Sequence, residues 1–84
     1  MPYIRNADRK KFDEILYKLP LINSPGTLNY ALTILCKQYL LENGETYQSY
    51  NDIVGALEGC KLELYRIKIA SYEEKKKIEN GEVY

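Results

Sequence analysis

The sequence has no histidine and no tryptophan, and only two of its 84 residues are cysteines. Histidine completes the usual catalytic triads, is the common general base near neutral pH and ligates nearly all catalytic zinc ions, so its absence excludes most enzyme chemistry. Cys36 and Cys60 are too far apart in the sequence for a zinc ribbon or a CxxC redox pair. Phosphate loops of the GxxxxGK[ST] or GxGxxG type do not occur either. We therefore expect a protein that is not an enzyme and that holds no metal and no cofactor.

Paired carboxylates are the acid–base chemistry that the sequence leaves open. Glu58 and Glu63, or Asp13 and Glu14, could serve as acid and base. The sequence predicts no pocket around either pair, so we interpret them as surface charges.

Long apolar runs and an excess of charge of one sign are also missing. No run of about 18 apolar residues is present, and the start of the chain, MPYIRNADRKKF, lacks the apolar region of a signal peptide. Twelve basic residues balance twelve acidic ones, so no net positive charge attracts duplex nucleic acid. Both cysteines fall on apolar faces of predicted helices, where free thiols suit a reducing compartment. We expect a cytoplasmic protein that binds neither membranes nor duplex nucleic acid.

The spacing of apolar residues predicts an all-α fold with three helices and no strand. The first helix covers about residues 7–19, and Asn6 is its predicted N-cap. The second covers about residues 25–42. Ser24 is placed to cap its free amides, and Pro25 has the backbone conformation that the first helical position needs.

The third helix is the longest. The second helix ends at Asn43 or Gly44, either of which can adopt the left-handed conformation that closes a helix. Ser49 is the predicted cap of the third helix, which covers about residues 50–79 and leaves a short tail, 80–84. We expect one helical domain over the whole chain.

Apolar residues on the third helix follow the alternating spacing of four and three that helices use to pack along their length. The residues of this seam are Ile53, Leu57, Cys60, Leu64 and Ile67. A helix of about 30 residues spans about 45 Å, whereas a compact domain of this size is roughly 26 Å across. We therefore expect the helical bundle to be completed by further copies of the chain, as a homo-oligomer.

Gly55 and Gly59 interrupt the third helix with small residues. Each glycine inside a helix costs about 1 kcal/mol relative to alanine, so a compensating interaction is expected. We predict a helix-packing position here, where the second helix or a second subunit crosses closely.

The aromatic residues of the chain are nine tyrosines and one phenylalanine. Tyrosine suits interfaces because it combines a large apolar area with a polar tip. Three residues of the third helix, Glu58, Tyr65 and Tyr72, are spaced seven apart and therefore lie on one side of it, with charged residues beside them. This face can stack a base while a cation engages a phosphate, or it can form a polar seam between subunits. Its predicted ligand-binding residues are Glu58, Lys61, Tyr65, Arg66, Tyr72 and Glu73.

A second polar line lies near the start of the second helix. Asn29, Thr33 and Lys37 are spaced four apart, close to free amides that attract anions. We include Asn29 and Thr33 among the candidate ligand-binding residues. The alternative is a solvated helix face.

The segments MPYI, PGTLNYALTIL and YNDIVGALEGCKLELYRIKIASYEEKKKIENGEVY resemble a family of small helical proteins of unknown function found in bacteriophages and some bacteria. Members of that family end in a motif similar to YE..K...NG.VY, and the resemblance covers essentially the whole chain. Glu82 stands where the family pattern favours Asp, and Ile67 where a second Arg is common. The resemblance implies a phage-type origin, and phages carry small helical proteins that act by binding, including oligomeric sponges for the cyclic nucleotides of bacterial immune signalling.

Two functions follow as expectations. The first is a non-enzymatic viral accessory protein in the host cytoplasm, homo-oligomeric, that binds a small anionic ligand such as a signalling nucleotide to counter host defence. The alternative is an adaptor or inhibitor that docks onto a host protein through its C-terminal helix and its tail, Glu82, Val83 and Tyr84.

Overall fold

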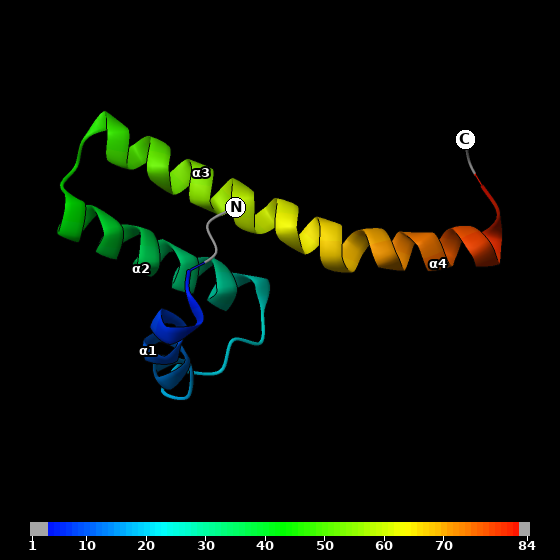
Figure 1. The fold of residues 1–84 in the computed structure, drawn as a ribbon, viewed down its shortest axis with the longest axis horizontal. Coiled ribbons are helices and arrows are strands. Elements are labelled where there is room, and N and C mark those ends of the chain that lie inside the picture. Colours follow the sequence, from blue (N-terminus) through cyan, green and yellow to red (C-terminus); the bar gives the residue numbers. More distant parts are fainter. Residues whose placement is uncertain (1–3, 83–84) are drawn as a thin grey trace. The chain divides into compact units, whose positions relative to one another are not determined.

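The computed structural model describes residues 4–82, and these form helices without any strand. The elements are α1 (Asn6–Leu16), α2 (Pro25–Asn43), α3 (Tyr47–Leu64), a π-helical turn η1 (Tyr65–Ile69) and α4 (Ala70–Asn80) (Figure 1). Since α3, η1 and α4 follow one another without a break, they make one helix of 34 residues. The predicted all-α fold with three helices and a long last one is therefore confirmed.

The chain divides into two compact units, Met1–Ile53 and Val54–Tyr84, and the boundary falls inside α3. The first unit contains α1, α2 and the start of α3. The second contains the rest of the long helix and the residues that follow it. The single domain expected from the sequence stays a prediction.

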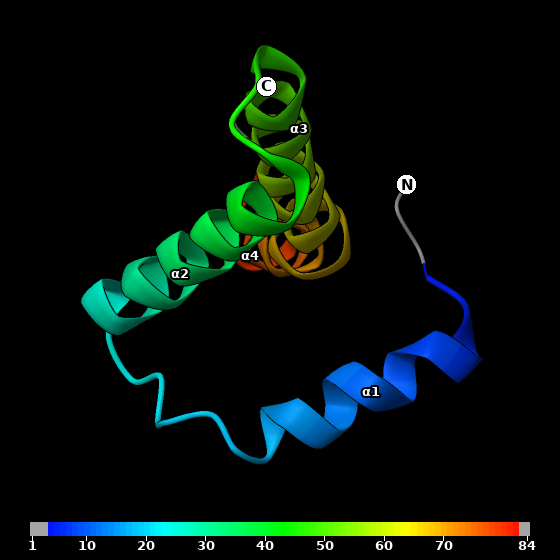
Figure 2. The same ribbon diagram turned by 90° about the vertical axis from the view of Figure 1, so that its left-hand side faces the viewer.

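The first helix is shorter than predicted at its C-terminal end, and its cap is different. Arg5, not Asn6, is the N-cap: its backbone is extended, and its carbonyl accepts from the amides of Asp8 and Arg9. The helix ends at Leu16 instead of residue 19, because Pro20 disfavours helical backbone at Leu19 just before it. A non-helical linker leads on to α2 (Figure 2).

The second helix begins and ends at predicted residues. Ser24 Oγ accepts from the Thr27 amide at 3.1 Å, and Thr27 Oγ1 accepts from the Ser24 amide at 3.1 Å, which completes a capping box. Pro25 occupies the first helical position. Of the two predicted terminating residues it is Gly44 that has a positive φ, 85°, and its amide donates to the Leu40 carbonyl at 2.7 Å.

The third helix begins three residues before its predicted start. Thr46 Oγ1 accepts from the Ser49 amide at 3.1 Å, the geometry of an N-cap with Ser49 at the third helical position. The expectation that Ser49 is the cap is therefore wrong. Both residues are good caps, and Thr46 takes the role because it lies next to the turn at Gly44.

A polar cluster ties α2 to the start of α3 within the first unit. The Tyr39 hydroxyl donates to Asp52 Oδ2 at 2.9 Å, and Gln48 Nε2 donates to Asp52 Oδ1 at 2.8 Å. Both oxygens of the carboxylate are thus engaged, one by each helix. This cluster sets the geometry of the α2–α3 connection.

The described residues lack an apolar core. No large apolar side chain in residues 4–82 is buried, and Ser49, 4% exposed, is the one buried residue among them. Burial of apolar side chains is the main stabilising term in most domains, and the described residues make little use of it within the chain.

We expect Tyr39→Phe to weaken the α2–α3 connection at neutral pH but not in strong alkali. The hydrogen bond to Asp52, then desolvation and the carboxylate charge, raise the pKa of Tyr39 above its ordinary value of about 10. Because the folded-state pKa is raised, the contribution is complete below about pH 10 and is lost as the pH rises through the raised value. Urea unfolding followed by circular dichroism measures the difference between variant and wild type.

Tyr30→Phe is the matched control, since Tyr30 also lies on α2 and the structure shows no hydrogen bond of its hydroxyl to any residue from 4 to 82. Equal stability of Tyr39→Phe and Tyr30→Phe at neutral pH would contradict the role of the polar cluster.

Candidate functional site

Charged residues of the predicted ligand-binding face are paired along α3 and η1. The Lys61 ammonium lies 3.4 Å from a Glu58 carboxylate oxygen. The Arg66 guanidinium lies 2.8 Å from a Glu63 carboxylate oxygen. Residues three apart are neighbours on a helix surface, so both pairs follow from the spacing of the residues. The Lys61 pair lies about one turn before Tyr65, and Arg66 follows Tyr65 directly in the sequence. An anionic ligand on this face must therefore compete with Glu58 and Glu63.

The helix changes its hydrogen bonding directly after this face. In η1 the amide of Ala70 donates to the carbonyl of Tyr65, five residues earlier instead of four. The Ser71 hydroxyl also donates to the Ile67 carbonyl at 3.1 Å. The turn accommodates one extra residue. Each residue after η1 therefore takes the position on the helix surface that the residue before it would have in an unbroken α-helix. Such π-helical turns occur frequently at functional sites.

This change of register brings Tyr65 to Glu73. The Tyr65 hydroxyl donates to the Glu73 carboxylate, with distances of 3.2 and 3.3 Å to its two oxygens. In an unbroken helix the residue seven positions on, Tyr72, would share the face of Tyr65. The extra residue gives that place to Glu73, so the predicted row of Glu58, Tyr65 and Tyr72 is interrupted at η1. The hydrogen bond to Glu73 and its negative charge, with some desolvation, raise the pKa of Tyr65.

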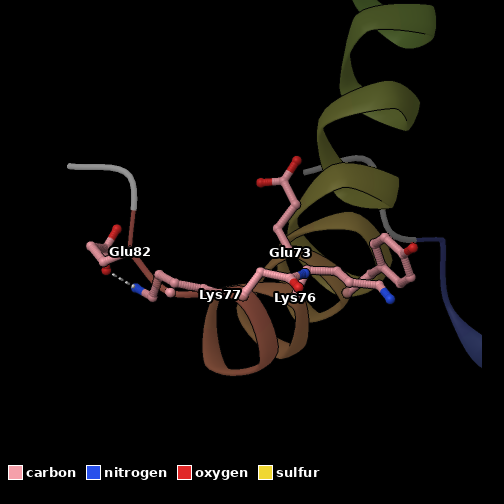
Figure 3. Close-up of a pocket in the computed structure, with 7 residues that line it drawn as sticks. Glu73, Lys76, Lys77 and Glu82 are labelled. Atoms are coloured by element: carbon pink, nitrogen blue, oxygen red, sulfur yellow. Dashed lines mark ion pairs between the residues drawn. The ribbon is translucent and has the colours of Figure 1, made fainter.

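Tyr72 lies against a different set of residues. The Lys76 ammonium stands 5.6 Å from the centroid of the Tyr72 ring, a cation–π contact. Lys76 also pairs with Glu79 at 3.1 Å. This ring forms one wall of an open pocket of about 410 Å³ at the end of α4 (Figure 3). The pocket is lined by Tyr72, Glu73, Lys76, Lys77, Asn80, Gly81 and Glu82.

The pocket depends on the way the chain leaves α4. Gly81 has φ 91° and ψ 160°, a region that only glycine adopts readily. Beyond it, Glu82 turns back to the helix and pairs with Lys77 at 3.1 Å, as the dashed line in Figure 3 shows. Lys77 also lies 3.4 Å from Glu74. The sequence predicts a helix that ends at about residue 79 and a tail that includes Glu82, but it does not predict the pairing of Glu82 with Lys77, because that pairing depends on the conformation of Gly81.

Asn29 and Thr33 contact each other on α2, in the first unit. The Thr33 hydroxyl donates to the Asn29 carbonyl at 2.9 Å, within the helix. The structure therefore brings these two candidate residues together and gives the Thr33 proton an internal acceptor. The other six candidates belong to the second unit.

Gly55 and Gly59 have room for larger side chains. A Cβ built on either glycine meets no atom of the described chain within 4 Å. On a helix of 3.6 residues per turn, both glycines lie on the side away from Leu57, Cys60 and Leu64. A close crossing of helices at the glycines stays a prediction, and it uses a different face from the apolar seam.

Two absences hold for residues 4–82. No group of three or more His, Cys, Asp or Glu side chains lies close enough to hold a metal ion. No helix in this range is both long enough and apolar enough to span a membrane.

The fold and the site define a small all-α protein whose polar candidate residues lie mainly along one long helix. The chain belongs to the family described as Domain of unknown function (DUF6899), whose model matches residues 1–83. No curated protein and no solved structure matched the chain. The expected membership of a family of uncharacterised function is thus confirmed.

The tail proposed for the alternative adaptor function consists of Glu82, Val83 and Tyr84. Of these, Val83 and Tyr84 lie outside the described residues.

We expect Gly81→Ala to open the pocket by releasing Glu82 from Lys77. Alanine at φ 91° and ψ 160° costs about 1–3 kcal/mol, so the backbone will leave this conformation. The hydrogen bond from Lys77 to Glu82, followed by the charge and hydrogen bond of Glu74, raises the pKa of Lys77. Titration by NMR should show that pKa falling toward its ordinary value in the variant. Gly55→Ala, a substitution inside the helix, is the control and should leave it unchanged; an unaltered Lys77 pKa in Gly81→Ala would refute the arrangement.

Proposed function

We propose that the chain is a non-enzymatic binding protein of phage type that works as a homo-oligomer and holds a small anionic ligand. A signalling nucleotide of host defence is the ligand class that the tyrosine-rich surface suits best. The observation that carries the proposal is the lack of a buried apolar side chain among residues 4–82. The phage-type origin is supported by the sequence resemblance described above.

Self-association is supported by the second unit taken alone. Its described residues form one helix and a short tail, so the unit itself holds no second element on which the helix can bury its apolar side. Leu57, Leu64 and Ile67 are 41%, 54% and 45% exposed. Since about half of each side chain is still exposed, burying the rest is worth about 0.8–1.5 kcal/mol per residue, a substantial amount against the total stability of so small a protein. Their spacing of four and three is the pattern that a second copy of the same helix complements.

Ligand binding is supported by the exposure and composition of the Tyr65 face. Lys61 and Glu58 are 70% and 53% exposed, and exposed ion pairs contribute only about 0–1 kcal/mol. A ligand phosphate can therefore replace a carboxylate at small cost and gain a charge-assisted hydrogen bond, which for Arg66 can be bidentate. The Tyr65 ring, 47% exposed, offers an aromatic surface for a base.

We expect Leu64→Asp to dissociate the oligomer. The substitution places a charge on the apolar seam and removes about 0.8–1.5 kcal/mol of burial per chain, or about 1.5–3 kcal/mol per pair of chains, which weakens association at least about tenfold. Leu62→Asp is the matched control, because Leu62 is 57% exposed on the opposite side of the same helix. Sedimentation equilibrium over a range of concentrations measures both. A wild-type chain that stays monomeric throughout, or equal effects of the two variants, would remove the proposed assembly surface.

We expect cyclic di- or trinucleotides, or ADP-ribose derivatives, to stabilise the oligomer and Arg66→Ala to abolish the effect. A ligand at 100 times its dissociation constant adds about 2.7 kcal/mol to the folded state, which a thermal-shift screen detects easily. Calorimetry then gives the affinity, and Arg9→Ala on α1 controls for the loss of one positive charge. No response to any of these nucleotides up to millimolar concentration would exclude this ligand class.

A further inference from the structure

The extra residue in η1 matters for the apolar seam as well as for the polar face. In an unbroken α-helix the seam of Leu57, Cys60, Leu64 and Ile67 continues through positions 71, 74 and 78, and so reaches Ile78. With one residue added in η1, the same side of the helix continues instead through positions 72, 75 and 79. These are Tyr72, Lys75 and Glu79, of which two are charged, whereas the unbroken register places Ser71, Glu74 and Ile78 there, of which one is charged. The π-helical turn therefore removes Ile78, which is 79% exposed, from the seam.

The polar face changes in the same way. With η1 in place, Glu73 lies beside Tyr65 and puts a carboxylate next to the ring. Without the extra residue, Tyr72 takes that position and Glu73 moves aside. An unbroken helix thus changes both surfaces: it leaves one charged residue instead of two on the extended seam, and it replaces a negative charge by a second ring on the ligand face.

The charges that flank the seam favour a second copy in parallel orientation. In the unbroken register, lysines 61, 68 and 75 all lie on one flank, and Glu63 lies on the other. Antiparallel helices would bring the lysine flank of each chain against that of the other. Parallel helices bring Glu63 of one chain to Lys68 of the other, an attractive pair five positions apart. Glu63, whose side chain is 25% exposed, pairs with Arg66 within the chain, so the pair between chains competes with this ion pair.

We propose that η1 is a register switch: a second copy packs in parallel along the seam and converts η1 to α-helical hydrogen bonding. This inference rests on the proposed function, because it names the partner and the regulation of the same surface. The conversion moves the Ala70 amide from the Tyr65 carbonyl to the Arg66 carbonyl and breaks the Tyr65–Glu73 hydrogen bond. Ion pairs that lie wholly within α4, such as Lys76–Glu79, persist in both registers because their spacing does not change.

Disulfide trapping distinguishes the two registers. In a background with Cys36→Ser and Cys60→Ser, a single cysteine is introduced as Ile78→Cys or as the adjacent control Glu79→Cys. Parallel helices place identical seam positions against each other, so Ile78→Cys should cross-link under mild oxidation while Glu79→Cys should not. Cross-linking of Glu79→Cys in preference would show that the oligomer keeps η1, and would overturn the switch. Cross-linking of neither, in a chain that sedimentation shows to be oligomeric, would overturn the parallel arrangement. A monomer at all concentrations would overturn the proposed function together with this inference, so the two failures are distinguishable.

Removing the Tyr65–Glu73 hydrogen bond tests the same switch without cysteine. Tyr65→Phe should tighten association at least about threefold in sedimentation equilibrium, because it destabilises the π-helical form alone. Tyr72→Phe keeps the ring over which Lys76 lies and should have no such effect. Unchanged or weaker association of Tyr65→Phe relative to Tyr72→Phe would contradict the proposal.

Discussion

A lone helix cannot bury its own apolar side, and the remaining features of the second unit follow from that constraint. Intrahelical hydrogen bonds satisfy the backbone, and ion pairs three residues apart, such as Lys61–Glu58, satisfy the charged groups locally. The side chains of Leu57 and Leu64 gain nothing from either, since hydrophobic burial needs a second surface. Within the second unit the helix is therefore complete in its hydrogen bonds, and its apolar side has no packing partner inside that unit.

Local signals in the sequence predicted most of the fold. The capping box at Ser24 and the stop at Gly44 were found because each depends on residues a few positions away. The caps of α1 and α3 were placed wrongly for the same reason. Several neighbouring residues can cap a helix equally well, and the choice between Thr46 and Ser49 depends on the turn before them. Helix existence and type therefore follow from periodicity, whereas the exact ends depend on competition among nearby residues.

The candidate site was predicted less completely, because its geometry depends on the one extra residue that the π-helical turn η1 inserts into the helix. The heptad row of Glu58, Tyr65 and Tyr72 assumes uniform α-helical geometry, and the π-helical turn leaves no mark in composition or spacing. The contact between Tyr65 and Glu73 joins residues eight apart, a separation that helical periodicity does not bring together. The pocket at the end of α4 was missed on similar grounds, since it follows from the backbone conformation of a single glycine.

The anion site proposed above cannot rest on net charge, because the chain has none. A site built on net positive charge would attract every polyanion in the cell, and its affinity would fall steeply with salt. On this helix the two cations of the proposed site, Lys61 and Arg66, are each held beside a carboxylate, so their charges are largely balanced within the chain. At the proposed site a ligand that offers both phosphate and a stackable ring gains from Lys61 or Arg66 and from Tyr65 together, whereas a ligand with one of these groups gains from one contact alone. The selectivity of the proposed site comes from this combination, and the proposed register switch, which removes Glu73 from the ring, makes the Tyr65 ring available only in the oligomer.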